Sequence, residues 1–153
     1  MHAENITTLV MGSPVTTPHS IPVLHTSTPS CVGEPFMVNG EIYRVTALSF
    51  GTPHGAVLVE DIDSVDVETL GAALGTHARF PKGASIVFFQ VYDKNSIKVR
   101  LWQRAIGETP LTPEAVCVAG TAAKMLKKIH TGDVRILMGD YSIQVNCNTQ
   151  KSE

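Results

Sequence analysis

The stretch from residue 100 to residue 120, RLWQRAIGETPLTPEAVCVAG, contains the corner at which we first look for chemistry. Residues 100–104 alternate as an extended segment does, and apolar residues recur at helical spacing over residues 113–129. The corner between a strand and a helix often holds an anionic substrate, because the first N–H groups of the helix are unpaired and its dipole favours negative charge. Here the corner reads Pro-Leu-Thr-Pro-Glu, without a run of glycines and with a carboxylate, Glu114, at the helix start. The corner is therefore either an active site or what remains of one.

Three side chains near this corner have the chemistry for proton transfer. Thr112 can act as a weak acid or hydrogen-bond donor, and Glu114 can act as a base if burial raises its pKa. His54 follows Pro53 at a strand break, where its ring can reach a cleft. Each also has a structural interpretation: Thr112-Pro113-Glu114 is a well-formed helix start, with a cap, a first-turn proline and a first-turn acid, and His54 can bond to the backbone in a turn.

The elements that must position these side chains follow from the periodicity of the sequence. Asn39-Gly40 is a strong turn signal, and residues 12–35 contain five prolines, which predicts an extended edge segment or loop. We expect strands over residues 41–50, 55–60, 84–92 and 97–104, a final hairpin over 134–138 and 141–147, and helices over 66–74 and 113–129. The order predicts an α+β domain in which a curved, mainly antiparallel sheet wraps one long central helix, with 1–37 as an N-terminal strand and loop segment and 38–153 as the domain proper.

Composition excludes several classes of protein. The chain has 153 residues, 43% hydrophobic and 17% charged, with a net charge of -2, which fits one ordinary globular domain and gives no basic surface for nucleic acid or anionic lipid. No apolar run approaches the ~20 residues that span a bilayer. Three scattered cysteines predict neither a disulfide framework nor a zinc site, and His2, His19 and His25 lack ligand spacing, so we expect no metal. We expect a cytoplasmic protein with no membrane contact.

Three motifs in order resemble the C-terminal half of the diaminopimelate epimerase family. They are Gly51-Thr52-Pro53-His54, the stretch HARFPKG over residues 77–83, and RLWQRAIGET over residues 100–109, in matching spacing across residues 38–147. The resemblance implies a family fold of two similar halves, each with a central helix and with the active site between them, of which this chain supplies one. It also implies two-base racemisation without a cofactor, in which one cysteine removes an α-proton and a cysteine of the other half returns one. We therefore expect no cofactor.

The corner departs from the family pattern at the positions that matter for this chemistry. The pattern Glu-Arg-Gly-x-Gly-Glu-Thr-x-Ala-Cys-Gly-Thr-Gly is matched here by residues 103–115, so that Arg104 and Gly107-Glu108-Thr109 are kept. Thr112 stands in place of the cysteine, and a hydroxyl has a pKa far above that of a thiol, ~8.5. Pro113-Glu114-Ala115 replaces the glycine-rich anion cradle. Diaminopimelate epimerisation as such is therefore not expected, although some hydroxyproline-dehydrating relatives also carry threonine at this position.

The resemblance also assigns four substrate-contacting positions. Thr52 and Ser85 match asparagines of the family, Gln103 matches the glutamate that assists proton transfer, and Arg104 is unchanged. Arg104 has a structural interpretation as well, in which it holds Glu108 or a carbonyl group. Cys117, in an apolar helix, is interpreted as a small buried hydrophobic residue, and the same interpretation is given to Cys31 and Cys147.

Three hypotheses remain open. The first is a cofactor-independent isomerase of racemase or epimerase type, or a related lyase, acting on an amino-acid-like substrate with His54, Glu114 or Thr112 as proton-transfer groups. A lone half must then complete its cleft, and a symmetric homodimer would imitate the missing half. The second is a non-catalytic half-domain that binds a partner or ligand. The third is one half of a split epimerase that pairs with a second half-domain.

Overall fold

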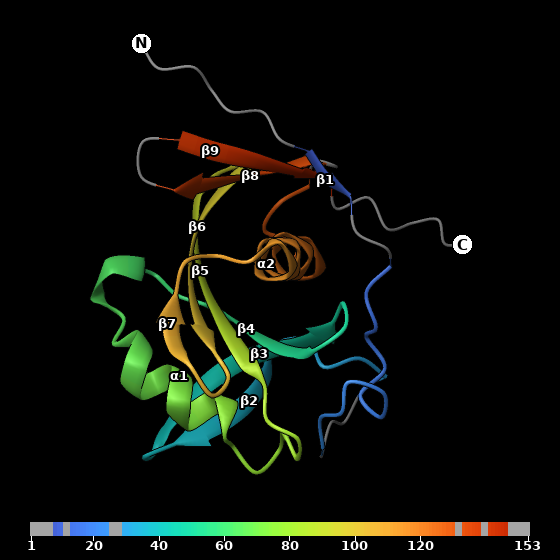
Figure 1. Ribbon diagram of the computed structural model, residues 1–153, viewed down its shortest axis with the longest axis vertical. Helices are drawn as coiled ribbons and strands as arrows, with labels where there is room; N and C mark the ends of the chain where they lie inside the picture. Colours follow the sequence, from blue (N-terminus) through green and yellow to red (C-terminus); the bar gives the residue numbers. More distant parts are fainter. Residues whose placement is uncertain (1–7, 11–12, 25–28, 131–132, 139–140, 147–153) are drawn as a thin grey trace.

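A single sheet organises the chain (Figure 1). The computed structural model describes residues 8–10, 13–24, 29–130, 133–138 and 141–146. The strands and helices in chain order are β1 (Thr8–Val10), β2 (Glu34–Val38), β3 (Glu41–Ser49), β4 (Pro53–Leu58), the 3-10 helix η1 (Ile62–Ser64), α1 (Val67–Gly75), β5 (Ser85–Asp93), β6 (Ser96–Gln103), β7 (Gly107–Thr109), α2 (Pro113–Met125), β8 (Asp133–Met138) and β9 (Tyr141–Asn146).

The sheet is mixed, with the strand order β1-β9-β8-β6-β5-β4-β3-β2 and with β7 also paired to β6. The pairs β1/β9, β4/β5 and β6/β8 are parallel, and the other pairs are antiparallel. The tight turn between β2 and β3 is formed as predicted, since Asn39 and Gly40 both have positive φ, 51° and 84°. The predicted α+β class is confirmed.

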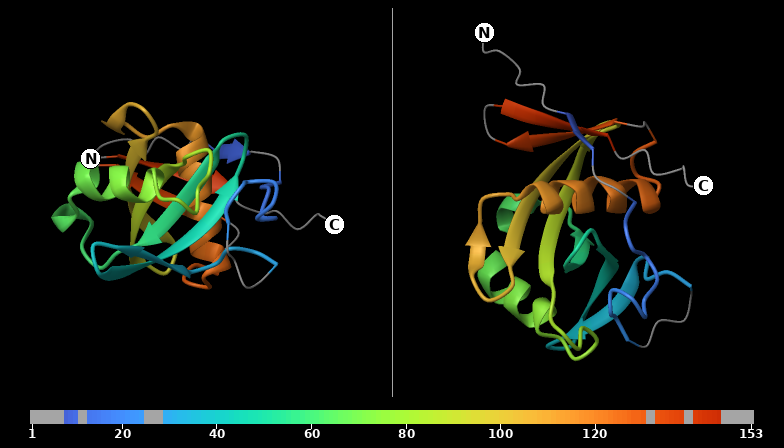
Figure 2. Two further views of the ribbon diagram at one scale, coloured as in Figure 1. Left: turned by 90° about the horizontal axis from the view of Figure 1, so that it is seen from below. Right: turned by 45° about the vertical axis from the view of Figure 1, so that its right-hand side comes forward.

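Helix α2 lies inside the curve of the sheet, which passes around it in Figures 1 and 2. Every residue from Ala115 to Ala123 is buried, and the helix contacts the inner strands of the sheet, β3, β4, β5, β6, β8 and β9. A helix that is apolar on all sides must be enclosed, and its small residues let the strands approach closely. The predicted central helix is therefore confirmed.

The end of α2 lies earlier than predicted. We expected the helix to reach Ile129, but it ends at Met125 because Lys127 adopts a left-handed conformation with φ 62°. The N–H of Leu126 donates to the Ala122 carbonyl, the N–H of Lys127 donates to the Lys124 carbonyl, and the N–H of Lys128 turns back to Ala123. These bonds satisfy the last carbonyls of the helix and close it.

A second apolar core lies on the other side of the sheet, under α1. It contains Trp102, whose ring contacts Gly71 and Gly75 of α1, together with large residues of β2 and β5 and the segment around Ile21. The two glycines allow the helix to lie directly on the indole ring, because neither has a side chain to hold it away. The Pro-rich segment is thereby joined to the sheet through its own apolar residues.

Strand β2 is the last strand of the sheet, and its outer carbonyls are bonded by side chains. The His77 ring donates from Nε2 to the Met37 carbonyl at 3.1 Å, and Arg79 donates from Nη1 to the Pro35 carbonyl at 2.6 Å. Arg79 also lies over the Phe36 ring, 4.3 Å from its centroid. Side chains that bond an exposed edge hinder its pairing with another strand.

Strand β2 was not predicted, and the expected boundary between residues 37 and 38 falls inside it. Residues Glu34 to Val38 pair with β3, and Pro35 lies opposite Arg44 in this pairing. Proline argues against a strand unless the strand is at an edge, which is the case here. The 3-10 turn η1 and the strand β7 were likewise not expected.

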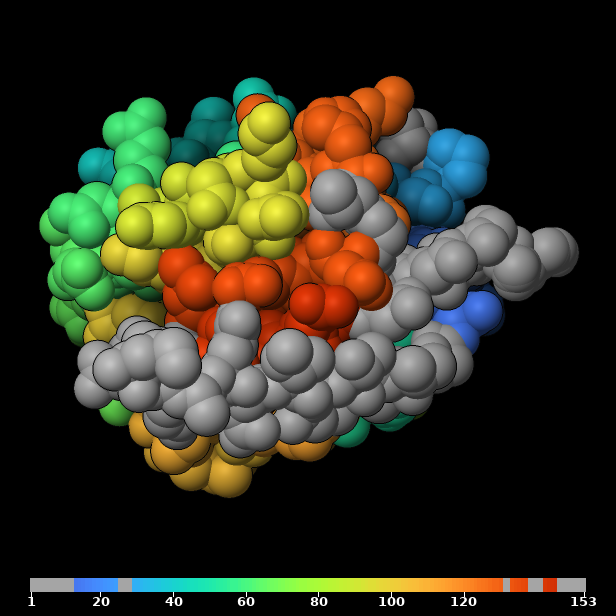
Figure 3. Space-filling model, turned by 90° about the horizontal axis from the view of Figure 1, so that it is seen from above, coloured from blue at the N-terminus to red at the C-terminus, as the bar shows by residue number. Residues whose placement is uncertain are grey.

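The outer edge of β6 is divided between two neighbours. Ser96 to Lys98 pair with β8, while Leu101 to Gln103 pair with β7. Figure 3 shows the surface formed by β8 and β9, which is bordered by the tip of the β5–β6 hairpin in yellow. The last residue of the predicted final strand, Cys147, lies outside the described residues. In the described part of the chain, neither helix is long and apolar enough to cross a membrane.

Candidate active-site corner

The predicted site residues lie at neighbouring strand ends beside the start of α2. His54 of β4 is the register partner of Ser85, the first residue of β5. The Ser85 hydroxyl accepts the Arg104 N–H at 3.0 Å, just beyond the end of β6. Glu114 of α2 reaches the turn that precedes β4. The structure therefore brings residues from three separate parts of the sequence, residues 52–54, 85 and 104–114, to one corner.

Glu114 turns away from open solvent and bonds to the β3–β4 turn. Its Oε2 atom accepts the Thr52 N–H at 2.9 Å and the Thr52 hydroxyl at 3.0 Å. The same oxygen lies 3.7 Å from Nδ1 of His54, and the Glu114 side chain is 25% exposed. Thr52 and Glu114, which were both predicted to act on a substrate, therefore bond to each other.

The His54 side chain is buried, and its burial favours the uncharged form of the ring. Its Nδ1 lies 3.0 Å from the Thr52 carbonyl oxygen, which can only accept, so Nδ1 carries the proton. Burial lowers the pKa of His54 below its usual 6.5, although the Thr52 carbonyl and Glu114 both favour the charged form. The ring of His54 bonds to the backbone, as its structural interpretation allowed, but His54 lies in β4 rather than in a turn, and Glu114 is an additional neighbour.

The lowered pKa of His54 predicts a pH-dependent stability. The unfolded chain takes up this proton near pH 6.5 and the native protein only at lower pH, so the unfolded state binds more protons in between. Stability is therefore complete above pH ~6.5 and falls as the pH drops through the window below it. Urea unfolding of the wild type and of His54→Gln should show a stability difference that changes with pH over roughly pH 5 to 7. Parallel pH curves for the two proteins would contradict this assignment.

Thr112 is the N-cap of α2. Its hydroxyl oxygen accepts the Ala115 N–H at 3.0 Å, and its backbone is extended, with φ -94° and ψ 159°. Pro113 follows in the first turn, where its missing N–H leaves no bond unmade. The structural interpretation of Thr112-Pro113-Glu114 as a helix start is confirmed. A catalytic role for Thr112 stays a prediction.

Gln103 and Arg104 are held by protein groups. The Gln103 amide donates to the Thr109 hydroxyl at 3.0 Å, and the Arg104 guanidinium donates to the Lys82 carbonyl. Arg104 therefore holds a carbonyl group, as its structural interpretation allowed, and the partner of Glu108 is a different arginine. The substrate-contacting roles of Thr52, Ser85, Gln103 and Arg104 stay predictions.

Arg100 fixes the segment that leads into the corner, and sequence reasoning did not identify it. Its guanidinium makes two bonds to Glu108, at 2.8 and 2.9 Å, and Nη1 donates to the carbonyls of Ile62 and Val65. From α1, Glu68 accepts the Glu108 N–H at 3.0 Å. One indication of these contacts was visible in the sequence, because Gly107-Glu108 is unchanged from the family pattern. Gly107 has φ 117°, and a side chain at this position would crowd the Glu68 carboxylate.

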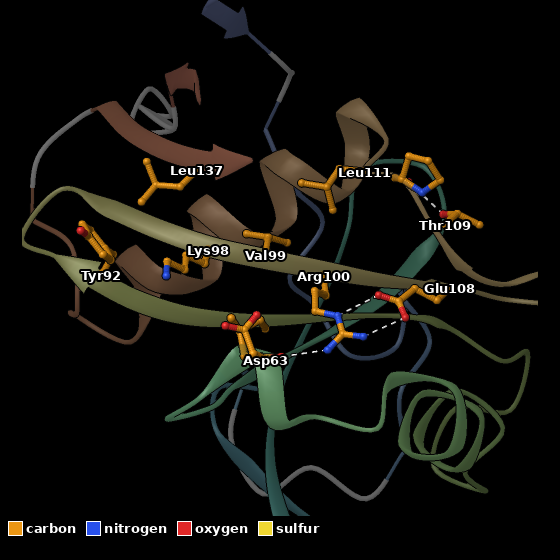
Figure 4. Close-up of a pocket in the computed structure, with 11 residues that line it drawn as sticks. Asp63, Tyr92, Lys98, Val99, Arg100, Glu108, Thr109, Leu111 and Leu137 are labelled. Atoms are coloured by element: carbon orange, nitrogen blue, oxygen red, sulfur yellow. Dashed lines mark hydrogen bonds and ion pairs between the residues drawn. The ribbon is translucent and has the colours of Figure 1, made fainter. Parts of the chain in front are cut away.

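A cavity of about 830 Å³ lies beside β6 rather than at the corner (Figure 4). It occupies the gap between β7 and β8, with Val99, Leu111 and Leu137 as apolar walls and the Arg100–Glu108 pair at one side. None of the predicted site residues lines it. Among the described residues, no group of three or more His, Cys, Asp or Glu side chains could hold a metal ion.

Comparison with known proteins agrees with this fold and these motifs. The sequence pattern of the diaminopimelate epimerase family matches residues 46–153. A diaminopimelate epimerase of Oceanobacillus iheyensis is 34% identical over 143 residues, which are 92% of this chain and 50% of that protein. The diaminopimelate epimerase of Methanococcus maripaludis is 31% identical over 137 residues, 89% of this chain and 49% of that protein.

A relative of higher identity covers less of the chain. The diaminopimelate epimerase of Pelotomaculum thermopropionicum is 40% identical over 91 residues, 60% of this chain and 32% of that protein. Together with the fold, these matches define the class: an α+β protein that resembles one half of a diaminopimelate epimerase. The chain belongs to the diaminopimelate epimerase family, and it spans about half the length of the curated relatives that match most of it.

Proposed function

We propose that this chain is a half-domain of a cofactor-independent isomerase, of racemase or epimerase type, with an altered active site that does not epimerise diaminopimelate by itself. The observation that supports the proposal is the identity and bonding of the residue at the start of α2. Thr112 stands at the position where the family pattern has cysteine, and its hydroxyl oxygen is used to cap α2. A threonine hydroxyl does not lose its proton near neutral pH without strong activation.

No described thiol can replace the missing base. Cys117 is 2% exposed inside the core around α2. Cys31 is fully buried at the other core, and burial raises the pKa of its thiol to about 11. A general base must reach the proton that it removes and must have a pKa near the working pH. If the corner transfers protons at all, the remaining pair is His54 with Glu114.

A second half is required for two-base chemistry. Racemisation by two bases needs groups on opposite faces of the reacting carbon, and this corner presents one set. Because the chain spans about half the length of its relatives, we propose that a second copy of the chain, in a symmetric dimer, or a separate half-domain completes the cleft. A mass in solution near twice 16.4 kDa would support the homodimer.

The test is exchange of the α-proton. Purified protein is incubated in D₂O with diaminopimelate, and loss of the α-proton signal is followed by NMR. We expect no exchange above the protein-free rate. Exchange that is present in the wild type and is lost in Thr112→Val would overturn the altered-site proposal, because it would show that the hydroxyl is active.

The binding of Glu114 by Thr52 favours a second candidate, a non-catalytic half-domain. The Oε2 atom of Glu114 already accepts two hydrogen bonds from Thr52, so this oxygen is occupied by the protein's own donors and not by a substrate. A screen of other amino acids and hydroxy acids in the same exchange experiment separates the candidates. Exchange with any of them that disappears in Glu114→Gln would exclude the non-catalytic one.

A further inference from the structure

We infer that the groove between α1 and the β2–β3 hairpin is a docking site for a short segment of a partner protein, in which an apolar side chain is flanked by lysine or arginine. The groove has a volume of about 470 Å³. None of the residues of the candidate corner lines it. The inference therefore goes beyond the proposed function and does not depend on it.

One wall of the groove is a single face of α1, which lies beside β2 in Figure 1. The N-cap Asp66 and the residues three, four and seven positions later, Thr69, Leu70 and Ala73, line this wall. Residues at this spacing are neighbours on one face of a helix. The wall is therefore a continuous stripe, and it has a carboxylate at its N-terminal end.

The other wall is the β2–β3 hairpin. Val38 and Glu41 both line the groove and are register partners, so their side chains lie on the same face of the sheet. Tyr43 follows Glu41 by two residues and lies on that face as well. This wall also combines apolar residues with one carboxylate.

The floor of the groove is apolar and continuous with the core under α1. Five half-buried residues line the groove and also pack against that core: Val38, Tyr43, Val59, Val65 and Leu70. Because each of them is anchored in the core, the floor keeps its shape without an occupant. An apolar side chain placed on this floor would remove apolar surface of both partners from water, which is favourable.

The rim of the groove is acidic. Glu41 of the hairpin and Asp66 of the helix are exposed, and none of the lining residues that the structure describes is a cation. The segment that leads into α1, residues 60–68, contains five acidic residues and no basic one. Carboxylates on two walls create a negative potential, which attracts lysine and arginine and repels acidic segments.

Both carboxylates are held in position and can still accept further bonds. Glu41 Oε1 accepts the Tyr43 hydroxyl at 3.1 Å, and Asp66 Oδ1 accepts the Thr69 N–H at 3.2 Å. An ionised carboxylate has about four acceptor sites, so one bond leaves room for a cation. Arg100, whose charge acts on Asp66, is itself bonded to Glu108 and to two carbonyl groups and does not line the groove.

Charge complementarity decides the kind of occupant. An apolar centre with a polar, charged rim is the usual anatomy of a protein interface. A basic segment without an apolar side chain would leave the floor uncovered, and an acidic segment would be repelled. The volume lies at the lower end of the roughly 300–1,000 Å³ of ligand sites, which suits one or two side chains of a short segment.

The test follows the amide signals of the ¹⁵N-labelled full chain during titration with the synthetic peptide acetyl-Gly-Lys-Leu-Lys-Gly-amide. Saturable shifts should gather at Tyr43, Thr69, Leu70 and Ala73, with a dissociation constant on the order of 1 mM at low salt. Peptides with serine in place of leucine, or with glutamate in place of lysine, should bind at least roughly fivefold more weakly. Shifts of the same signals on concentrating the protein without peptide would identify a second copy as the occupant and overturn the inference.

Matched variants of the chain separate charge from shape. Asp66→Asn keeps a good N-cap, and Glu41→Gln keeps an acceptor for Tyr43. Each should weaken peptide binding by about two- to fivefold, the effect of losing one exposed ion pair. Ala73→Leu should fill the groove without changing its charge and should abolish saturable binding. Asp93→Asn removes an exposed carboxylate outside the groove and should leave binding unchanged.

Several outcomes would contradict the docking site. They are the absence of a saturable shift at ~10 mM peptide, equal binding of the lysine and glutamate peptides, and binding that Ala73→Leu leaves unchanged. If Ala73→Leu folds poorly, Thr69→Leu fills the groove from an exposed position of the same helix face. No readout depends on turnover, so failure here is distinct from failure of the exchange experiment.

Discussion

Replacing Arg79 by methionine should lower the free energy of unfolding by about 3 kcal/mol, because two backbone carbonyls and one carboxylate lose a charged donor at once. Arg79 donates from Nη1 to the Pro35 carbonyl at 2.6 Å and from Nε to the Leu24 carbonyl at 2.9 Å. It also pairs with Glu34 at 3.7 Å, where the two side chains are only 13% and 12% exposed. Methionine keeps the apolar stem over Phe36 but leaves Glu34 without this charge. Urea unfolding measures the loss.

The matched control is Arg44→Met on β3, an exposed arginine of the same sheet. A surface substitution of this kind should change stability by no more than about 0.5 kcal/mol. Arg79→Lys separates charge from geometry, because an ammonium group cannot reproduce the planar set of donors. If Arg79→Lys is as stable as the wild type, charge alone holds this edge and the geometric argument fails. If Arg79→Met is equally stable, the edge contacts contribute nothing.

Replacing Gly75 by alanine should destabilise the protein by about 2 kcal/mol, the middle of the range for overpacking a core. A Cβ atom at Gly75 would lie 2.4 Å from Cζ3 of Trp102 and 2.6 Å from the Ala84 carbonyl oxygen. The ring is part of the buried core, and the carbonyl belongs to the backbone, so neither can move freely. Alanine favours a helix interior over glycine by up to ~1 kcal/mol, but Gly75 is the last residue of α1, where this gain is smaller.

Thr69→Ala, at an exposed position of the same helix, is the control for Gly75→Ala. It should leave the midpoint of thermal unfolding close to that of the wild type, whereas Gly75→Ala should lower it by several degrees. Near-ultraviolet circular dichroism reports on the single tryptophan and should change in Gly75→Ala alone. A Gly75→Ala protein that is more stable than the wild type would show that helix propensity outweighs the contact with Trp102.

The regular elements of this fold could be predicted because their signals are local. The Asn39-Gly40 turn, the apolar run of β5 and the spacing within α2 each depend on neighbouring residues. Strand β2 could not be predicted in the same way, because Pro35 is acceptable only at the edge of a sheet, and edge position is a property of the whole fold. The parallel pairing of β4 with β5 is likewise set by the crossover through α1 rather than by either strand.

The candidate site was predicted in its members but not in its contacts. The motifs indicated Thr52, His54 and Glu114, and the structure brings these three together. That Glu114 bonds to Thr52 depends on the meeting of a turn and a helix 62 residues apart. The roles of Arg79 and Arg100 were missed for a related reason, since each bonds to carbonyl groups, which every residue possesses and no sequence pattern marks.

The divided edge of β6 has a consequence for motion. Strand β8 is joined to β6 by three register positions, while β8 and β9 are joined to each other by six. We therefore expect the β8–β9 hairpin, together with β1, to separate from β6 more readily than its own ladder opens, which would expose one side of α2. Local opening of this kind requires less free energy than global unfolding, so amide hydrogens at the β6–β8 contact should exchange with solvent sooner than those between β5 and β6.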